Sequence, residues 1–141
     1  MNIFKYINTH TKLTFTGRFR QACVSAFAIC CIQDHKTTAE ELETVRYMLD
    51  NVRLKDLDQE GVLREFEITL GHLKTRPDHI KKHRKILQEF KGSDAAGSIM
   101  AMCLSICESD GLDPKEVHGM LNIAQDLKVD IQLFSQMIKN K

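Results

Sequence analysis

Two segments of the chain are apolar on every side, and they limit the folds open to this sequence more than any other feature. They read QACVSAFAICCIQ over residues 21–33 and SIMAMCLSIC over residues 98–107. A helix that is apolar all round is buried inside a soluble domain. Cysteine and alanine suit that position because their small side chains let neighbouring helices approach closely. The sequence therefore predicts two central helices enclosed by the rest of the chain.

The surrounding helices are expected from apolar stripes at helical spacing. The four stripes are Leu42, Val45, Leu49 and Val52; Val62, Phe66, Leu70 and Leu73; Ile80, His83, Leu87 and Phe90; and Val117, Leu121, Ala124 and Leu127. Pro77 marks a helix start, and Gly92 begins the break before the second buried helix. Residues 130–139 are expected to form a short last helix.

Composition agrees with one all-α domain. The 141 residues are enough to bury a core, and two prolines with seven glycines leave little room for a turn-rich all-β fold. The net charge of +1 provides no overall field that would attract nucleic acid. No apolar run reaches the roughly 18 residues that a membrane-spanning helix needs. The first residues, MNIFKYINTHTKLTF, are a poor secretory signal.

The two halves of the chain repeat one unit, which consists of a buried helix, an acidic break and a capped amphipathic helix. An offset of 76 residues aligns the pairs Cys31/Cys107, Asp34/Asp110, Thr37/Asp113 and Glu40/Glu116. Two such units would pack around a pseudo-twofold axis and bring their breaks to comparable positions. The expected fold is an all-α bundle of about seven or eight helices over residues 16–141. Residues 1–15 are expected to be a tail or a short helix.

The second acidic break, CESDGLDPKE, contains a strong helix-start signal. Asp113 is expected as the N-cap, Pro114 at the first helical position and Glu116 at the third, which together form a capping box. Thr37 and Glu40 are expected to form the same box in the first half. These residues therefore have a structural explanation that requires no ligand.

Asp34 and Asp110 lie at equivalent positions, and both positions are locally unfavourable for a carboxylate. Each follows a buried helix, at the end where the helix dipole disfavours a carboxylate. Residues that violate a local preference twice are candidates for function. Carboxylates from the two breaks can together chelate a hard divalent cation such as Ca²⁺. Neither break has the ligand spacing of an EF-hand, so such a site must be assembled across helices.

The segment CESDGLDPKEV and its weaker copy CIQDHKTTAEEL resemble the TerB-like tellurite-resistance family. The resemblance extends from Thr16 to Phe134. It implies an all-helical, duplicated domain with an acidic surface proposed to bind a divalent metal. The acidic positions that match are Asp34, Glu40, Glu41, Asp110, Asp113 and Glu116. The chain departs from the family pattern at His35, where glycine is usual, and at Thr37 and Thr38, which leave fewer acidic residues in the first break.

The function that this resemblance implies is non-catalytic, in stress-response or membrane-associated complexes. The expected ligand is a divalent cation, with Ca²⁺ favoured; alternatively, the acidic surface is presented to a protein partner. An ion that ties the two halves together would stabilise the folded state by mass action. Helix capping alone is the competing interpretation of the same acids. No small-molecule substrate is expected.

A basic helix over residues 74–85 offers an alternative function. Lys81, Lys82, Arg84 and Lys85 are expected on its outer face. Nucleic acid or an anionic membrane surface would be the partner of such a face. The segment lacks interleaved aromatic residues, and a solvated face that docks against acidic regions of the same chain is the favoured interpretation.

The five cysteines are expected to be buried, reduced thiols of a cytoplasmic protein, because their neighbours are apolar. They are Cys23, Cys30, Cys31, Cys103 and Cys107. A zinc site built from four of them is the alternative. His79 and His83 have the spacing of a zincin helix, but lysine stands where the catalytic glutamate would be. The sequence contains no nucleophile elbow or phosphate-binding loop, so an enzyme is not expected.

Overall fold

The computed structural model describes residues 3–32, 37–108, 114–132 and 136, apart from the side chains of residues 114–117. In this part of the chain every regular element is a helix, which confirms the predicted all-α fold. The elements are α1 (Ile3–His10), α2 (Gly17–Cys31), α3 (Thr38–Asp50), α4 (Gln59–Thr75), the 3-10 turn η1 (Pro77–His79), α5 (Ile80–Gln88), α6 (Asp94–Glu108) and α7 (Pro114–Leu127). None of these helices, within the described residues, is both long and apolar enough to cross a membrane.

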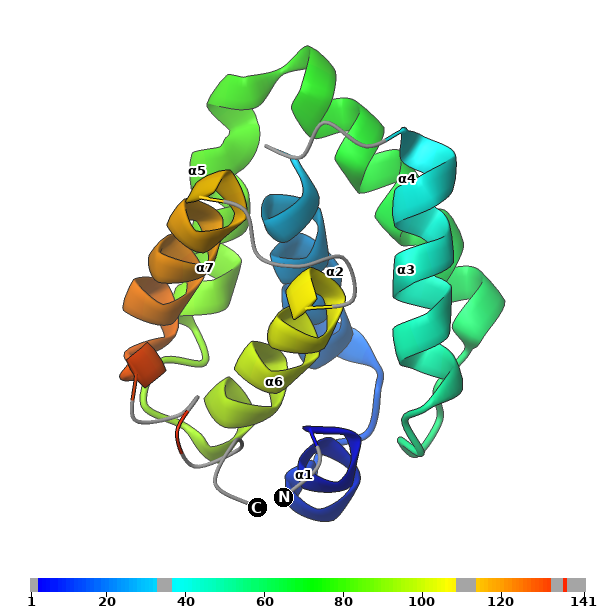
Figure 1. Cartoon of the computed structure of the whole chain (residues 1–141), viewed down its shortest axis with the longest axis vertical. Coiled ribbons are helices and arrows are strands. Elements are labelled where there is room, and N and C mark those ends of the chain that lie inside the picture. The colour runs from blue at the N-terminus through cyan, green and yellow to red at the C-terminus, as the bar shows by residue number, and fades with distance from the viewer. Residues whose placement is uncertain (1–2, 33–36, 109–113, 133–135, 137–141) are drawn as a thin grey trace.

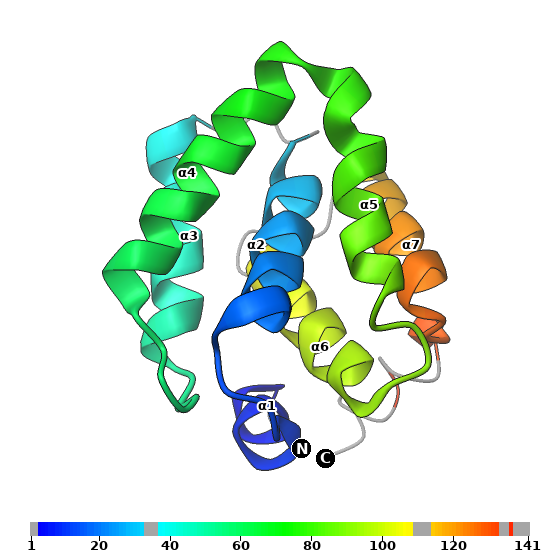
Figure 2. The same ribbon diagram turned by 180° about the vertical axis from the view of Figure 1, so that it is seen from behind.

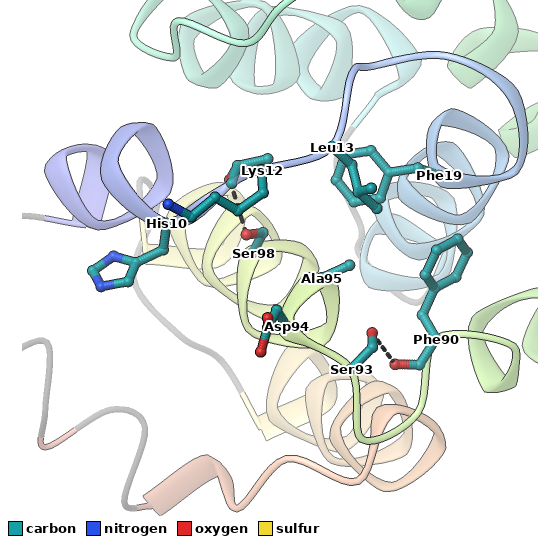
Figure 3. A pocket seen from close by; sticks show the side chains of 10 residues that line it. His10, Lys12, Leu13, Phe19, Phe90, Ser93, Asp94, Ala95 and Ser98 are labelled. Atoms are coloured by element: carbon teal, nitrogen blue, oxygen red, sulfur yellow. Dashed lines mark hydrogen bonds between the residues drawn. The ribbon is translucent and has the colours of Figure 1, made fainter.

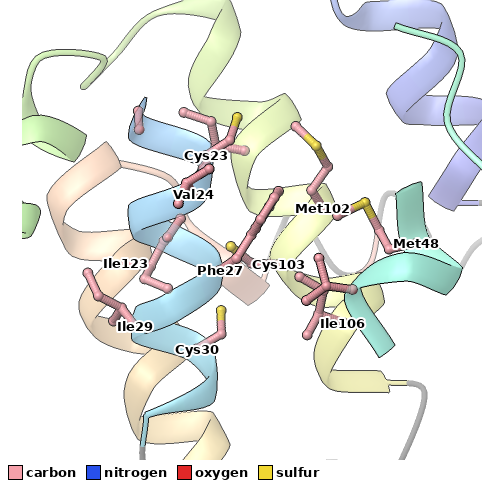
Figure 4. Close-up of a cluster of buried hydrophobic side chains, with 14 of the residues drawn as sticks. Cys23, Val24, Phe27, Ile29, Cys30, Met48, Met102, Cys103, Ile106 and Ile123 are labelled. Atoms are coloured by element: carbon pink, nitrogen blue, oxygen red, sulfur yellow. The ribbon is translucent and has the colours of Figure 1, made fainter. Parts of the chain in front are cut away.

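The two apolar segments form the central helices α2 and α6, which pack against each other in the middle of the molecule (Figures 1 and 2). Every residue over 22–31 and over 98–107 is buried, as predicted. Both helices begin before these apolar runs, at Gly17 and at Asp94. Figure 4 shows their contact, where Phe27 of α2 points toward the side chains of Met102, Cys103 and Ile106 of α6. The core of the protein is centred on this contact.

The packing repeats between the two halves of the chain. The offset of 76 residues relates α1 to α5, α2 to α6 and α3 to α7, with bounds that agree to within two residues. α1 packs on α6 while α5 packs on α2, and α3 packs on α6 while α7 packs on α2. This exchange of partners is what an approximate twofold axis between α2 and α6 produces. α4 has no equivalent in the described part of the chain and lies against α2 and α3.

Short-range signals place several helix ends where the sequence predicts them. The Thr37 hydroxyl accepts a hydrogen bond from the Glu40 N–H, and the Glu40 carboxylate accepts one from the Thr37 N–H, each at 3.2 Å. Pro77 begins η1. Gly92 precedes α6 with a φ of +69°, a left-handed conformation that glycine adopts without strain. The short helix predicted over 130–139 falls largely outside the described residues.

One helix contact depends on a buried charge. The side chain of Asp126 in α7 is only 3% exposed. Arg84 of α5 donates two hydrogen bonds to its carboxylate, at 2.8 Å from Nε and 3.0 Å from Nη2, and Gln88 donates a third at 3.2 Å. Arg84, whose side chain is 31% exposed, thus pairs with an acidic residue of the same chain, in agreement with the interpretation favoured from the sequence for this basic segment. A carboxylate removed from water requires a counterion, and α5 supplies it.

The variant Arg84→Met removes this counterion and leaves Asp126 buried without a charge partner. We expect the free energy of unfolding, measured by urea denaturation, to fall by about 3–5 kcal/mol. Lys85→Met, which changes an exposed lysine of the same helix, is the control and should shift it by less than about 0.5 kcal/mol. The double variant Arg84→Met/Asp126→Leu should regain most of the loss, because no charge then remains buried. Equal stability of Arg84→Met and the wild type would contradict this assignment.

Candidate functional site

The last turn of α2 is buried among α6 and α7. The Cys30 sulfur, in this turn, lies 3.7 Å from that of Met120 in α7. The Cys103 thiol of α6, together with burial, raises the pKa of the Cys30 thiol well above its ordinary value, while Cys107 acts in the opposite direction. The two acidic breaks directly follow α2 and α6 in the sequence.

The C-terminal ends of α2 and α6 carry negative charge, because the dipole of a helix places roughly half a negative charge there. The first turn of α3, a helix that packs on α6, contains the carboxylate of Glu41, which is only 1% exposed. Carbonyl and carboxylate oxygens are the ligands that Ca²⁺ takes in proteins. These groups are therefore of the chemical type that a hard cation favours.

The two neighbouring glutamates of α3 have different roles. The Glu40 carboxylate is exposed and closes the capping box with Thr37, so it has a structural role. Glu41 points roughly 100° away around the helix and is buried. The sequence contains a signal for this burial, because Glu41 lies four residues before Val45 and so shares the apolar stripe of α3. Of the two predicted ligands among the described residues, Glu41 is buried and Glu40 is exposed.

The remaining predicted ligands fall outside the described groups. Asp34, Asp110 and Asp113 lie outside the described residues, and so does the side chain of Glu116. Among the described residues, no group of three or more His, Cys, Asp or Glu side chains is arranged to hold a metal ion. The ion site across the two breaks, and the second capping box, therefore stay predictions.

All five cysteines belong to the described part of the chain. They are buried and form no disulfide. Burial raises the pKa of the Cys23 thiol well above its ordinary value and also raises that of Cys103. A raised pKa keeps a thiol protonated at neutral pH, where it is neither a good nucleophile nor a good metal ligand. These cysteines pack as small apolar groups, in agreement with the interpretation favoured from the sequence.

The prediction of one basic helix over residues 74–85 is wrong, because α4 ends at Thr75, η1 covers Pro77–His79 and α5 begins only at Ile80. Lys81, Lys82 and Lys85 are exposed. None of the three forms an ion pair with another described residue. Arg84 is instead committed to Asp126. The surface that could meet an anionic partner therefore consists of three lysines on one side of a short helix.

His83 faces inward and takes part in a groove that the sequence did not indicate. Its Nδ1 lies 2.8 Å from the hydroxyl of Ser25, a residue that is only 2% exposed. The groove has a volume of about 350 Å³, lies between α2, α4 and α5, and includes Val24, Ile68 and Ile86 in its lining. Since Ser25 belongs to the middle of α2, the contact with His83 satisfies a hydroxyl that would otherwise be buried without a partner.

The zincin-like spacing of His79 and His83 does not bring these two rings together as a pair of ligands. Nδ1 of His79 lies 2.6 Å from Nε2 of His72, at the turn between α4 and α5. His83 turns the other way, toward Ser25. The structure therefore gives these histidines separate partners.

Comparison with known proteins adds no family to this description. The chain matches no protein-family model, no curated protein and no solved structure. What the protein does must therefore be inferred from its own packing, burial and charge.

Stability should depend on pH through His83. Burial lowers the pKa of this imidazole, and the charges of Lys82, His72 and His79 lower it further. The unfolded chain then takes up a proton near about pH 6.5, before the folded protein does. We therefore expect the fold to lose stability as the pH falls from about 7.5 to about 5.5, measured as urea midpoints across that range.

The variant His83→Gln separates this effect from other titrations. Glutamine keeps a hydrogen-bonding group near Ser25 but does not titrate, so the loss of stability at low pH should be smaller than in the wild type. The control His10→Gln changes an exposed histidine and should keep the pH dependence of the wild type. If His83→Gln and the wild type lose stability equally, His83 is not the group responsible.

Proposed function

We propose that the protein is a non-catalytic, TerB-like helical module that binds one divalent cation where its two acidic breaks begin. The observation that supports this most directly is the packing of α2 against α6, the two central helices that the acidic breaks follow. Asp34 and Asp110 each follow the end of one of these helices closely in the sequence. A shared ion would join the two halves of the duplicated fold at this point.

The charge of the region favours Ca²⁺ as the ion. Two helix C-termini and the buried Glu41 carboxylate offer oxygen ligands and negative charge. Ca²⁺ takes about 6–8 oxygens in flexible geometry, whereas Mg²⁺ demands a nearly ideal octahedron. A site assembled from two separate breaks, with carbonyl and carboxylate oxygens mixed, suits the more tolerant ion. Neither break alone has enough ligands in the right order.

The wider role that we propose follows the family resemblance. The resemblance to the TerB-like family supports a function in stress response or tellurite resistance, with the acidic surface contacting a protein partner. The exchanged packing of the two halves supports the duplicated architecture that this family implies. Five thiols without a disulfide support a cytoplasmic location.

Thermal unfolding of the full chain after EDTA treatment, with and without Ca²⁺, Mg²⁺ or Zn²⁺, tests the cation site. At a free Ca²⁺ concentration about 100-fold above Kd, the folded state should gain about 2.7 kcal/mol. For a chain of this size the gain raises Tm by about 10 °C. The double variant Asp34→Asn/Asp110→Asn should lose the shift, because it removes a carboxylate from each break.

The matched control is Glu60→Gln/Glu67→Gln, which neutralises two exposed acids of α4 and should keep the whole Ca²⁺ shift. A shift of equal size in the Asp34→Asn/Asp110→Asn variant would place the ion elsewhere. If none of the three ions shifts Tm, the acidic breaks have only a structural role: each ends one helix and caps the start of the next.

A second candidate function is docking on an anionic partner, either nucleic acid or a membrane surface, through α5. The three exposed lysines, Lys81, Lys82 and Lys85, favour it. Binding to duplex DNA and to phosphatidylserine vesicles should fall steeply with salt, and the triple lysine-to-methionine variant should flatten that dependence. Lys55→Met/Lys91→Met, which removes two exposed lysines elsewhere, should leave it unchanged. Binding that is indifferent to salt or to the triple variant would exclude this function.

A further inference from the structure

A hollow lies at the end of the molecule opposite the α4–α5 turn. It is lined by charged and apolar side chains that belong neither to the acidic breaks nor to the lysines of α5. It has a volume of about 280 Å³ (Figure 3). Its walls come from the link after α1, the first turn of α2, the connection between α5 and α6, and the first turns of α6. Two stretches that are far apart in the sequence, residues 10–19 and 90–98, thus meet around one cavity.

One end of this cavity is apolar and aromatic. The rings of Phe19 and Phe90 pack edge to face, with centroids 6.0 Å apart and planes at 65°. Leu13 lies beside them with 45% of its surface exposed, and Ala95 completes this part of the lining. Concave sites with apolar walls and a few polar groups are where small molecules bind. This end suits a branched aliphatic or aromatic group of a ligand.

The other end of the cavity is polar. An adjoining hollow shares His10, Lys12, Ser93 and Asp94 with the first and continues toward Tyr6, so the two form one cleft. Lys12 and Asp94 form no ion pair with each other or with another described residue. The His10 Nδ1–H donates to the backbone carbonyl of Tyr6 at 3.0 Å, which leaves Nε2 of the neutral ring as an acceptor.

We propose that this cleft binds a small zwitterion with an apolar side chain, such as an apolar α-amino acid. The ligand ammonium would donate to the Asp94 carboxylate and to Nε2 of His10, and the ligand carboxylate would accept from the Lys12 ammonium. The apolar side chain would lie against Phe19 and Phe90.

Size and charge decide between ligand classes. Drug-sized ligands occupy pockets of about 300–1,000 Å³, so a cavity at the lower limit takes a small metabolite. A ligand with one charge satisfies either Lys12 or Asp94 and leaves the other in water, whereas a zwitterion pairs with both. The cleft lies at the N-terminal turns of α2 and α6, away from their C-terminal ends, so this binding does not depend on the cation site.

Chemical-shift titration of the ¹⁵N-labelled full chain with L-phenylalanine and with L-leucine tests the proposal. The amides of Leu13, Ala95 and Ser98 should shift and saturate with both amino acids. N-acetyl-L-phenylalanine lacks the ammonium and phenethylamine lacks the carboxylate, and each should bind at least about tenfold more weakly than L-phenylalanine. This series uses only the wild-type protein, so it does not depend on any variant that fails to fold.

Variants of the cleft then test which side chain binds each charge of the ligand. Asp94→Asn and Lys12→Met should each weaken L-phenylalanine binding by at least about tenfold. Glu67→Gln and Lys55→Met are the matched controls and should bind as the wild type does. The proposal is overturned if neither amino acid saturates, if both single-charge analogues bind as tightly as L-phenylalanine, or if the shifting amides lie outside the cleft.

Discussion

The contact between α2 and α6 determines most of the other packing in this protein. Both helices bury every side chain over their central turns, so each must be enclosed on all sides. Small residues such as Ala22, Ala26 and Cys103 keep the core compact. α5 and α7 cover α2, and α1 and α3 cover α6, while α4 covers another face of α2. Each central helix is therefore enclosed by equivalent helices of the repeat, and this repetition produces the approximate twofold symmetry.

Several polar groups are buried in this apolar interior, and three of them, Ser25, Glu41 and Asp126, belong to α2 or to helices that pack on the central pair. Asp126 is neutralised by Arg84, and the Ser25 hydroxyl is satisfied by His83, so both contacts bring α5 into a defined position. Buried polar pairs of this kind add little net stability, but their loss is strongly destabilising. Glu41 is the third group, and it differs because it belongs to the first turn after an acidic break. Its position connects the packing of the core with the proposed ion site.

The sequence patterns predicted those features of the fold that depend on interactions between residues close together in the chain. The apolar runs gave the central helices, and the Thr37 capping box follows from four adjacent residues. The sequence did not identify Asp126 as the partner of Arg84 because the two are 42 residues apart, and the contact of Ser25 with a residue 58 positions later was missed for the same reason. The proposed cleft has no local signature, since residues 10–19 and 90–98 form it together. Of the predicted acidic site, only the positions in the first turn of α3 could be compared with the fold.

A single ion shared by both halves is the central functional claim, and calorimetric titration of the EDTA-stripped protein with Ca²⁺ tests it most directly. We expect one ion per chain, and we expect either Asp34→Asn or Asp110→Asn alone to abolish binding, because neither break has enough ligands by itself. Two ions per chain, with each substitution removing one of them, would show that the halves bind independently and would contradict the shared site. A titration without binding heat, together with an unchanged Tm, would remove the cation from the function altogether.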